Sequence, residues 1–548
     1  MDRLFRSRRS TVYSTKGIVS STQPLANAAG TKILEKGGNA VDACIAVAAA
    51  LAVTEPASTG IGGDCFALYY SAKEKKVFGL NGTGRSASKM SIDWLKKNHP
   101  QHIMPNLRFK SESVFKVTVP GAVAGWCDAL GKWGSGKVTL ADCLQPSIEL
   151  SENGFPLSQC SADIWQGEVE RLLQMNEKDE NLKLFLPSED WSAPKTGDVI
   201  INKPFAETLK KIAKGGKDGF YSGEIARSIV KELNKRGHPM TTQDFSNHTS
   251  TFVEPICYSF LDHKLWEIPP NGSGIVALLT LGLIDSLNRN GTIELKSMKH
   301  NSVEYLHLII ECLKISFRDS DQAVSDYEYF KKKFEADFHS DAEQLLSSKK
   351  YFDSRSSLFH PDHAITNKEM KEGVPNDMFK SDTVYFTATD SEGNACSFIN
   401  SVYHGFGSCI IVPEHGFALH NRGGNFNLNP KSNNCLEGNK RPYHTIIPGM
   451  ITTESTTNPA ADEEELYATY GIMGGYNQPQ AHVQVYLNMI LFGMDPQEAL
   501  DASRISLFAH PEHKKLSDRG EGSDGPSSND ITCVGVEDDL DPDVVEGH

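Results

Sequence analysis

The chain has 548 residues, of which 39% are apolar and 23% charged, and its formal net charge is −15. This length and composition supply a large buried core, either in one big domain or in two to three ordinary ones. An acidic surface is repelled by nucleic acids and by anionic membranes, and no apolar run approaches the roughly 18 residues of a membrane-spanning helix. We therefore expect no nucleic acid and no membrane as partners.

The N-terminus and the cysteines favour a cytoplasmic protein. Residues 1–16 are basic and polar without an apolar segment behind them, which predicts a flexible tail and no secretion signal. The eleven cysteines stand singly, and none belongs to a Cys-x-x-Cys pair. We therefore expect neither a disulfide framework nor a zinc site, and a reducing environment.

Two helices are predicted between Pro24 and Val53. Gly37-Gly38 ends the first helix, and Asn39 is placed to cap the second. The second helix, from Ala40 to Val53, is apolar on nearly all sides apart from Asp42. Such a helix is typical of one buried between layers.

Strands and further helices follow along the chain. Cys65 to Tyr70 and Val77 to Leu80 are predicted as paired strands joined by a short charged turn. The region from about 120 to 380 is predicted to be mainly helical. Its last part, 352–380, contains Pro, Gly, Asn and charge with little periodicity, which indicates a loop or linker.

A hairpin is predicted directly after this linker. Thr383 to Thr389 alternates as a strand, Asp390 to Gly393 supplies a turn, and Asn394 to Tyr403 returns as a second strand. The residues from 516 to 548 are acidic and rich in Gly, Ser and Asp, which predicts a disordered tail.

The Asp382-Thr383 pair lies where the predicted linker meets the predicted strand. This junction would let the Thr383 hydroxyl attack the carbonyl of Asp382, and hydrolysis of the resulting ester would leave Thr383 with a free α-amino group. An unperturbed α-amino group has a pKa of about 8, so it can accept the hydroxyl proton itself. On spacing alone, an ordinary strand threonine is the favoured interpretation.

A second candidate feature is the glycine pair Gly474-Gly475, which leads into a predicted helix near Ala481. Backbone N–H groups at such a turn can point at a developing oxyanion, and glycine lets the chain approach the reacting carbon closely. A structural turn is the alternative interpretation.

Ordered matches from about Gly17 to Ser506 resemble the γ-glutamyltransferase family of N-terminal-nucleophile hydrolases. The matching segments are Gly37 to Ala43, Glu55-Pro56, Gly60 to Asp64, Val119 to Trp126, Gly154 to Pro156, Asp390 to Ala395, Phe406 to Ser408, Lys440 to Pro442 and Gly474-Gly475. The resemblance implies an α+β fold, a four-layer αββα sandwich, made by a proenzyme that cleaves itself. It implies a large subunit at 17–382 and a small-subunit core at 383–515, which stay associated after the cut.

The resemblance also implies the catalytic residues. Thr383 falls on the family's nucleophile, and Asp382 precedes the cleaved bond. Gly474 and Gly475 fall on the oxyanion hole, and Ser401 falls on the hydroxyl residue that hydrogen-bonds the nucleophile, with Ser in place of the usual Thr. A nucleophile that carries its own base needs no metal and no organic cofactor, so we expect none.

The expected substrate contacts differ from those of the glutathione-cleaving members. Thr83 stands where they carry the Arg that holds the glutamyl α-carboxylate, and the nearest guanidinium, Arg85, is displaced by two positions. Asn425 replaces the Asp that holds the α-amino group, Tyr403 replaces an Asn, and His444-Thr445 replaces a Ser-Ser pair. We expect these residues to bind the substrate.

A basic set, Arg422 and His444, stands in place of those contacts. The sequence around both residues resembles the branch of the family that includes oxamate amidohydrolases and proteins labelled glutathione hydrolase-like. A planar Arg fork suits a carboxylate, so we expect a small acidic amide as substrate. A structural salt bridge is the alternative for Arg422.

The end of the chain departs from the family as well. Family members usually continue with terminal strands that close the sheet, whereas this chain stops at His548. Either the chain is truncated or the sheet edge is completed differently, with consequences for processing and activity.

Three functions remain open at this point. The first is a self-processing amide hydrolase or acyltransferase that acts on a small acidic amide through an acyl-Thr383 intermediate. The second is a conventional glutathione hydrolase and γ-glutamyl transferase of glutathione metabolism, with a pocket rebuilt from other residues. The third is a non-catalytic homologue that binds a ligand or partner.

Overall fold

Two antiparallel β-sheets carry the architecture of the chain. The computed structural model describes residues 9–329, 331, 342–365, 382–454, 463–509 and 532–546. The first sheet has the strand order β1-β9-β10-β2-β3-β6, and the second has the order β12-β11-β8-β7. The strands of the first sheet are β1 (Gly17–Ser20), β2 (Asp64–Ser71), β3 (Lys76–Gly82), β6 (Thr251–Val253), β9 (Asp382–Asp390) and β10 (Ala395–Tyr403). Those of the second sheet are β7 (Ile256–Phe260), β8 (His263–Glu267), β11 (Gly449–Glu454) and β12 (Glu464–Tyr470).

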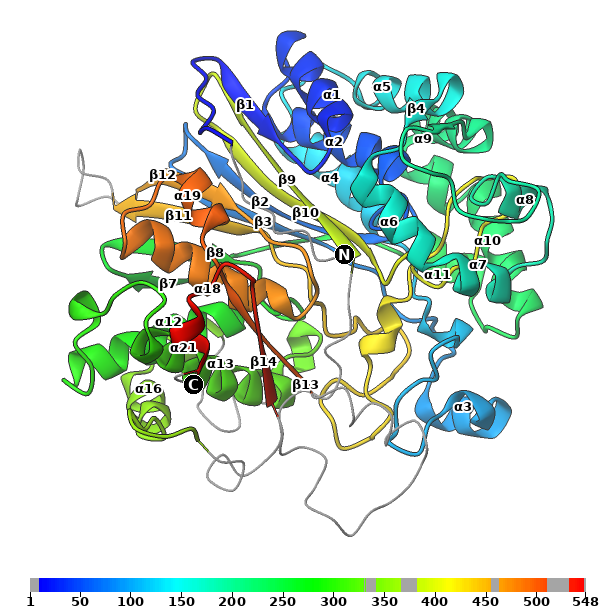
Figure 1. Cartoon of the computed structure of the whole chain (residues 1–548). Coiled ribbons are helices and arrows are strands. Elements are labelled where there is room, and N and C mark those ends of the chain that lie inside the picture. The colour runs from blue at the N-terminus through cyan, green and yellow to red at the C-terminus, as the bar shows by residue number, and fades with distance from the viewer. Residues whose placement is uncertain are drawn as a thin grey trace.

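Helices and short strands lie around these sheets (Figure 1). The helices before β9 are α1 (Pro24–Glu35), α2 (Ala40–Thr54), α3 (Ile92–Asn98), α4 (Ala122–Trp133), α5 (Leu140–Asn153), α6 (Gln159–Gly167), α7 (Val169–Met175), α8 (Glu180–Lys183), α9 (Lys203–Tyr221), α10 (Glu224–Lys235), α11 (Thr242–Ser246), α12 (Ile275–Arg289), α13 (Val303–Ala323), α15 (Ala342–Leu346) and α16 (Lys349–Ser356). The helices after β10 are α18 (Asn477–Ile490), α19 (Pro496–Asp501) and α21 (Pro542–Glu546). The short elements are the 3-10 helices η1 (Pro100–His102), η2 (Val114–Lys116), η3 (Leu295–Ser297) and η4 (Arg422–Asn425), and the strands β4 (Phe155–Pro156), β5 (Val199–Ile200), β13 (Ile505–Ala509) and β14 (Thr532–Val536).

The predicted helix pair near the N-terminus is confirmed as α1 and α2. Asn39 caps α2, because its side chain accepts from the backbone N–H groups of Val41 and Asp42 while the Asp42 carboxylate accepts from the N–H of Asn39. Every residue of α2 is buried. The helix packs against α1, α5 and the strands β9 and β10, and thereby supports the face of the sheet behind the hairpin (Figure 1).

The predicted hairpin is confirmed as β9 and β10. Its register pairs Phe398 with Phe386 and Asn400 with Val384, and a bulge after Asn400 leaves Tyr403 opposite Asp382. The rings of Phe386 and Phe398 stack with 5.1 Å between their centroids, a cross-strand pair that fixes the register. The earlier strand pair is confirmed as well, because β2 pairs with β3 and also with β10.

The two sheets face each other. The Ser397 hydroxyl on β10 donates to the carbonyl of Gly449 on β11 at 2.9 Å, and the hydroxyls of Thr387 on β9 and Thr469 on β12 are 2.7 Å apart. α12 packs on the second sheet against β7 and β8, and it also contacts α18. Figure 1 shows α1, α2 and α5 on one side of β9 and β10, and β11 and β12 on the other.

Both sheets combine strands from before and after Thr383. In the first sheet, β9 and β10 lie between β1 and β2, and in the second, β11 pairs with β8. Each sheet is therefore shared by the two parts of the chain that a cut before Thr383 would produce.

The described part of the region 120–380 is mainly helical, as predicted, but it also contains the strands β4 to β8. The prediction of a linker differs from the structure in part. The predicted linker 352–380 begins inside α16, where Phe352 is buried against Gly282 of α12. Residues 366–381 of that linker lie outside the described residues.

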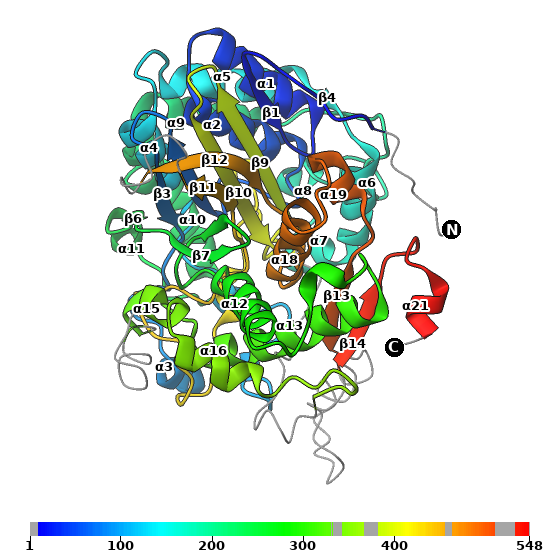
Figure 2. The same ribbon diagram turned by 90° about the vertical axis from the view of Figure 1, so that its left-hand side faces the viewer.

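The prediction for the C-terminal tail is wrong for residues 532–546. There β14 pairs with β13, and α21 follows. Apolar residues explain the order, since Leu540 is buried in the second hydrophobic core. Figure 2 shows β13 and β14 side by side next to α13. Residues 516–531, like residues 1–8 of the predicted N-terminal tail, lie outside the described residues.

None of the helices in the described ranges combines the length and the apolar character that crossing a membrane requires.

Candidate active site

Thr383 lies at the start of β9 and is completely buried. Its Oγ1 donates a hydrogen bond to Oγ of Ser401, on the neighbouring strand β10, at 3.2 Å. The Ser401 oxygen also accepts from the backbone N–H of Tyr403 at 2.8 Å. Because the Thr383 hydroxyl donates its proton in this contact, the lone pairs of its oxygen remain available for attack on a carbonyl carbon.

Arg422 joins this pair of hydroxyls from η4. Its Nη2 donates to Ser401 Oγ at 3.0 Å, and its Nη1 donates to Thr445 Oγ1 at 2.7 Å. The guanidinium carbon lies 4.3 Å from the centre of the Tyr403 ring, a cation–π distance. The structure therefore brings Thr383, Ser401, Tyr403, Arg422 and Thr445 into one cluster.

The positive charge of Arg422 is buried, and no described residue pairs with it through a carboxylate. Its side chain has 0% exposure, and among the described residues its Nε has no hydrogen-bond partner. Burial lowers the pKa of Arg422 to about 10, against the raising effect of Tyr403, Asp64 and Tyr476, so the group remains a cation at neutral pH. The alternative of a structural salt bridge has no support among these residues.

Tyr403 owes its position to the bulge at the end of β10. Its φ of 82° lies in the left-handed region, which is strained for a residue with a side chain. One face of its ring packs on Arg422, and the ring of His404 stacks on it at 4.3 Å. This backbone conformation places the face of the Tyr403 ring against the guanidinium group of Arg422.

His444 was predicted as a basic group, and that prediction is wrong. Its Nε2 donates to Asp64 Oδ2 at 3.2 Å, and its Nδ1 accepts from the backbone N–H of Ile446 at 3.4 Å. Burial, together with the positive charge of Arg422, lowers the pKa of His444 to about 3. The ring is therefore neutral with its proton on Nε2, and Arg422 is the cation of this pocket.

Asp64 is a member of the site that the sequence did not single out. Its Oδ1 accepts from the backbone N–H groups of Gly84 and Gly121, both at 3.0 Å. Burial alone would raise the pKa of Asp64, but the rings of His420 and His444 hold it well below its usual range. The carboxylate is thus a buried anion that fixes the orientation of His444.

The glycine-rich segment before Asp64 provides a signal for this role. A Cβ on Gly63 would lie 2.3 Å from the carbonyl oxygen of Ser401, and a Cβ on Gly62 would lie 2.1 Å from that of Ala418. Only glycine permits such a close approach. The two glycines therefore let this segment, and with it Asp64, pack against the end of β10.

The Gly474-Gly475 turn comes to the same region. Both glycines have positive φ, 112° and 59°, and α18 starts two residues later. A Cβ on the nearby Gly471 would lie 2.1 Å from the Tyr385 ring, and Tyr385 shares its face of β9 with Thr383 because side chains two apart on a strand point the same way. The chain just before the turn therefore lies against the face of β9 that carries Thr383.

The chain after this turn also contacts residues 443–447. The ring of Tyr476 stacks on that of Tyr443 at 5.6 Å, and the Gln478 side chain accepts from the backbone N–H of Ile447 at 2.9 Å. Asn425 contacts the same segment, since its Nδ2 donates to the Tyr443 carbonyl at 3.0 Å.

Arg85 does not reach the cluster around Thr383. Its Nη1 donates to the carbonyl of Thr249 at 3.3 Å, and it lies beside Arg441. The displacement by two positions from Thr83 sends its side chain to another part of the molecule, so its predicted role at the reacting substrate is not supported by the geometry.

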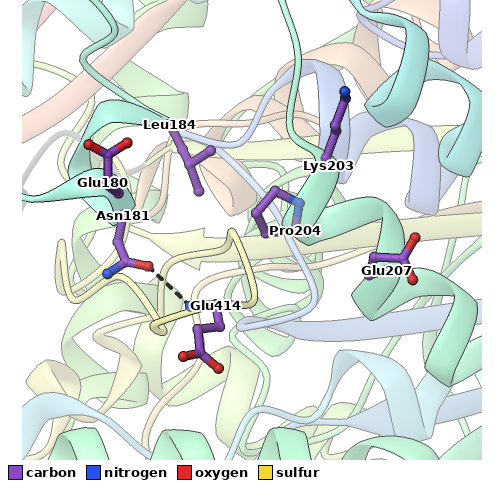
Figure 3. A pocket seen from close by; sticks show the side chains of 7 residues that line it. All are labelled: Glu180, Asn181, Leu184, Lys203, Pro204, Glu207 and Glu414. Atoms are coloured by element: carbon purple, nitrogen blue, oxygen red, sulfur yellow. Dashed lines mark hydrogen bonds between the residues drawn. The ribbon is translucent and has the colours of Figure 1, made fainter.

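A surface cleft of about 510 Å³ is a separate feature (Figure 3). Its lining residues are Glu180, Asn181, Leu184, Lys203, Pro204, Glu207 and Glu414. None of them belongs to the Thr383 cluster, and the cleft lacks a nucleophile with a neighbouring base, so it is not the candidate site.

A buried strand threonine that hydrogen-bonds a second hydroxyl is an arrangement that suits the nucleophile of a hydrolase or acyltransferase. The sequence profile of the γ-glutamyltranspeptidase family matches residues 26–524. The chain belongs to this family, as the sequence motifs predicted.

Named relatives cover nearly the same span. The glutathione hydrolase-like YwrD proenzyme of Bacillus subtilis is 33% identical over 493 residues, which are 90% of this chain and 85% of the relative. The oxamate amidohydrolase proenzyme of Klebsiella pneumoniae is 28% identical over 500 residues, 90% of this chain and 85% of the relative. The crystal structure of cephalosporin acylase from Bacillus halodurans has a TM-score of 0.77 at 35% identity and covers 92% of this chain and 86% of that one.

Proposed function

We propose that this enzyme cleaves itself before Thr383 and then hydrolyses, or transfers the acyl group of, a small amide that carries a carboxylate. Several relatives are proenzymes by name, among them a glutathione hydrolase-like protein and an oxamate amidohydrolase. One observation carries the choice of substrate: the buried guanidinium of Arg422 has no carboxylate partner among the described residues and donates to Ser401, the hydrogen-bond partner of Thr383.

Self-cleavage would use the contact between Thr383 and Ser401. Oγ1 of Thr383 attacks the carbonyl carbon of Asp382, the C–N bond between the two residues breaks, and an ester forms at Oγ1. Water then hydrolyses the ester, which leaves a carboxylate on Asp382 and an α-amino group on Thr383. With an unperturbed pKa of about 8, this amine is a suitable base at neutral pH.

Turnover would repeat the same attack on an external amide. The α-amino group takes the proton from Oγ1, the oxygen attacks the amide carbonyl, and the backbone N–H groups at Gly474 and Gly475 stabilise the oxyanion. The amine then leaves with a proton, and the acyl ester on Thr383 passes to water or to an acceptor amine. Apart from the amide substrate and the water or amine that accepts the acyl group, the steps use only groups of the chain.

The charges of the pocket favour a carboxylate without an α-ammonium group. Asn425 is neutral, and its amide already donates to the Tyr443 carbonyl. The Asp64 carboxylate accepts from two backbone N–H groups and from His444, so its lone pairs are engaged. The α-ammonium group of glutathione would lie near the positive charge of Arg422, with no free carboxylate beside it to compensate. The binding of glutathione is therefore unfavourable.

We also infer that the two sheets and their covering helices form the four-layer αββα sandwich of N-terminal-nucleophile hydrolases. The contacts of α2 with β9 and β10, the bonds between the sheets, and the packing of α12 on β7 and β8 support this arrangement. The cleaved parts would remain associated, because each sheet takes strands from both.

A turnover screen of the purified chain tests the proposed substrate class. Oxamate, glutathione and γ-glutamyl amides should be compared with des-amino amides that keep the carboxylate. The proposal expects the des-amino or oxamate-type amides to be processed with the higher kcat/KM. A strong preference for glutathione would instead favour the conventional γ-glutamyl activity.

A further inference from the structure

A pair of arginines, Arg85 and Arg441, lies apart from the Thr383 cluster. Nη1 of Arg85 and Nη2 of Arg441 both donate to the carbonyl oxygen of Thr249, each at 3.3 Å. Arg441 also donates to Thr251 Oγ1 at 3.1 Å. The two guanidiniums therefore lie side by side, although like charges repel each other.

No direct ion pair with a described residue neutralises the positive charge of these two arginines. Neither arginine forms an ion pair with any described residue, and the one acid that acts on both is Asp326, whose carboxylate accepts from the backbone N–H of Arg441 at 3.1 Å. Burial, together with the charge of Arg85, lowers the pKa of Arg441 to about 9. Asp64 also acts on Arg441, from the other side of the Thr83–Gly84 peptide, but neither carboxylate forms an ion pair with a guanidinium of this pair.

Further polar atoms without partners lie on the same segment as Thr249. Both ring nitrogens of His248 and the hydroxyl of Ser250 are buried without a hydrogen-bond partner among the described residues. Burial, with the charge of Arg441 next, lowers the pKa of His248 to about 3, so its ring is neutral and offers one donor and one acceptor. Buried polar groups normally find partners, so this arrangement indicates that a ligand supplies them.

The peptide between Thr83 and Gly84 separates this pair from the reaction centre. Its carbonyl accepts from Nε of Arg441 at 3.0 Å, and its N–H donates to Asp64 at 3.0 Å. The C=O and N–H of a trans peptide point in opposite directions. Arg441 and Asp64 therefore lie on opposite sides of one peptide group, and the Arg441 side is distinct from the pocket of Arg422.

We propose that Arg85 and Arg441 form a binding site for a small oxyanion, either a carboxylate or a phosphate. Guanidinium forks match the planar or tetrahedral oxygens of such groups, and an anion between them removes their mutual repulsion. Arg85 is partly exposed, which gives the anion access, whereas buried Arg441 forms the floor. This site does not depend on the proposed reaction at Thr383.

Titration of the full-length chain with inorganic phosphate tests the proposal. Calorimetry and thermal unfolding at constant ionic strength should show saturable binding with a rise in the unfolding midpoint. A parallel titration with acetate distinguishes a phosphate site from a carboxylate site. Arg85→Gln should weaken the affinity by about ten- to a hundredfold, since each lost charge-assisted hydrogen bond has that effect. Arg85→Lys should recover part of it.

Arg422→Ala is the matched control, because it removes the guanidinium of the pocket around Thr383 and leaves Arg85 and Arg441 in place. It should retain the binding that Arg85→Gln loses, and that pattern assigns the anion to the second site. The proposal is overturned if neither anion binds saturably, if Arg85→Gln binds as tightly as the wild type, or if binding is lost only in Arg422→Ala. Circular dichroism of each variant verifies the fold, and Arg85→Lys serves if Arg85→Gln does not fold.

Discussion

The hairpin β9–β10 and the segment 420–445 meet at Ser401, but they are built in different ways. The hairpin is a regular pair of strands, whose register places Thr383 beside Ser401. The segment 420–445 contains one short 3-10 helix, and buried hydrogen bonds from Arg422, Asn425 and His444 hold it in place. In the proposed mechanism, the regular hairpin carries the reacting hydroxyl, and the irregular segment 420–445 selects the substrate.

Loss of the Thr383 hydroxyl should have the largest effect, because no substrate can react without it. Thr383→Ala should abolish self-cleavage and lower turnover by at least about 10⁴-fold, whereas Thr383→Ser should retain part of both. Thr387→Ala is a matched control, since Thr387 shares the strand but contacts Thr469. Gels and steady-state rates measure both effects, and a cleaved, active Thr383→Ala enzyme would contradict the assignment.

A side chain at Gly474 should impair the reaction with every substrate. Its φ of 112° disfavours any other residue, so Gly474→Val should shift the backbone donors and lower kcat by about 100-fold or more. Gly493→Val, at another positive-φ glycine with open space around it, controls for backbone strain alone. Near-normal kcat in a folded, processed Gly474→Val enzyme would remove Gly474 from the oxyanion hole.

The effect of replacing Arg422 on kcat/KM should depend on the substrate. The hairpin and the segment 420–445 differ most in this respect, because only the segment is proposed to recognise the substrate. Arg422→Ala should lower kcat/KM for a carboxylate amide by about ten- to a hundredfold or more, with a smaller effect on an amide that lacks the carboxylate. Arg422→Lys should recover only part, because an ammonium has no bidentate fork. Arg289→Ala, at an exposed arginine paired with Asp285, is the control. Equal losses on both amides would mean that Arg422 serves the reaction and not the recognition.

Replacement of His444 should have the smallest effect on activity and a visible effect on stability. The folded pKa of about 3 lies below the ordinary value of 6.5, so the unfolded state takes up a proton that the folded state excludes. The free energy of unfolding should therefore fall as the pH drops from about 6.5 toward 3. His444→Gln keeps a donor for Asp64 and should flatten part of this fall.

Urea unfolding of both proteins between about pH 4 and 7 measures this difference. His248, whose pKa is lowered in the same direction, should keep some pH dependence in the variant. An unchanged slope in His444→Gln would mean that His444 is protonated in the folded state, as its basic character in the sequence suggested.

Sequence reasoning succeeded where the signal is local. The alternation from Thr383 onward, the turn after Asp390 and the cap at Asn39 are all set by neighbouring residues, and the structure contains each of these elements. The family was also predicted from ordered motifs and is confirmed.

Sequence reasoning failed where burial and contacts between residues far apart in the sequence determine the structure. The charge of His444 depends on its burial and on Asp64, a residue 380 positions away, and periodicity carries no information on such a contact. The direction of Arg85 depends on Thr249, far along the chain. The strand β14 was missed because its short apolar stretch lies in an acidic, glycine-rich part of the sequence, and its pairing with β13 is not visible in the sequence.

The identity of the N-terminal residue of the smaller fragment tests the central claim most directly. Purified, active enzyme should give two bands on a denaturing gel, and sequencing of the smaller band should begin with Thr383 followed by Val384 and Tyr385. Thr383→Ala should give a single band. An active wild-type enzyme that remains one intact chain, or a small fragment that begins at another residue, would contradict the assignment of Thr383 as the nucleophile.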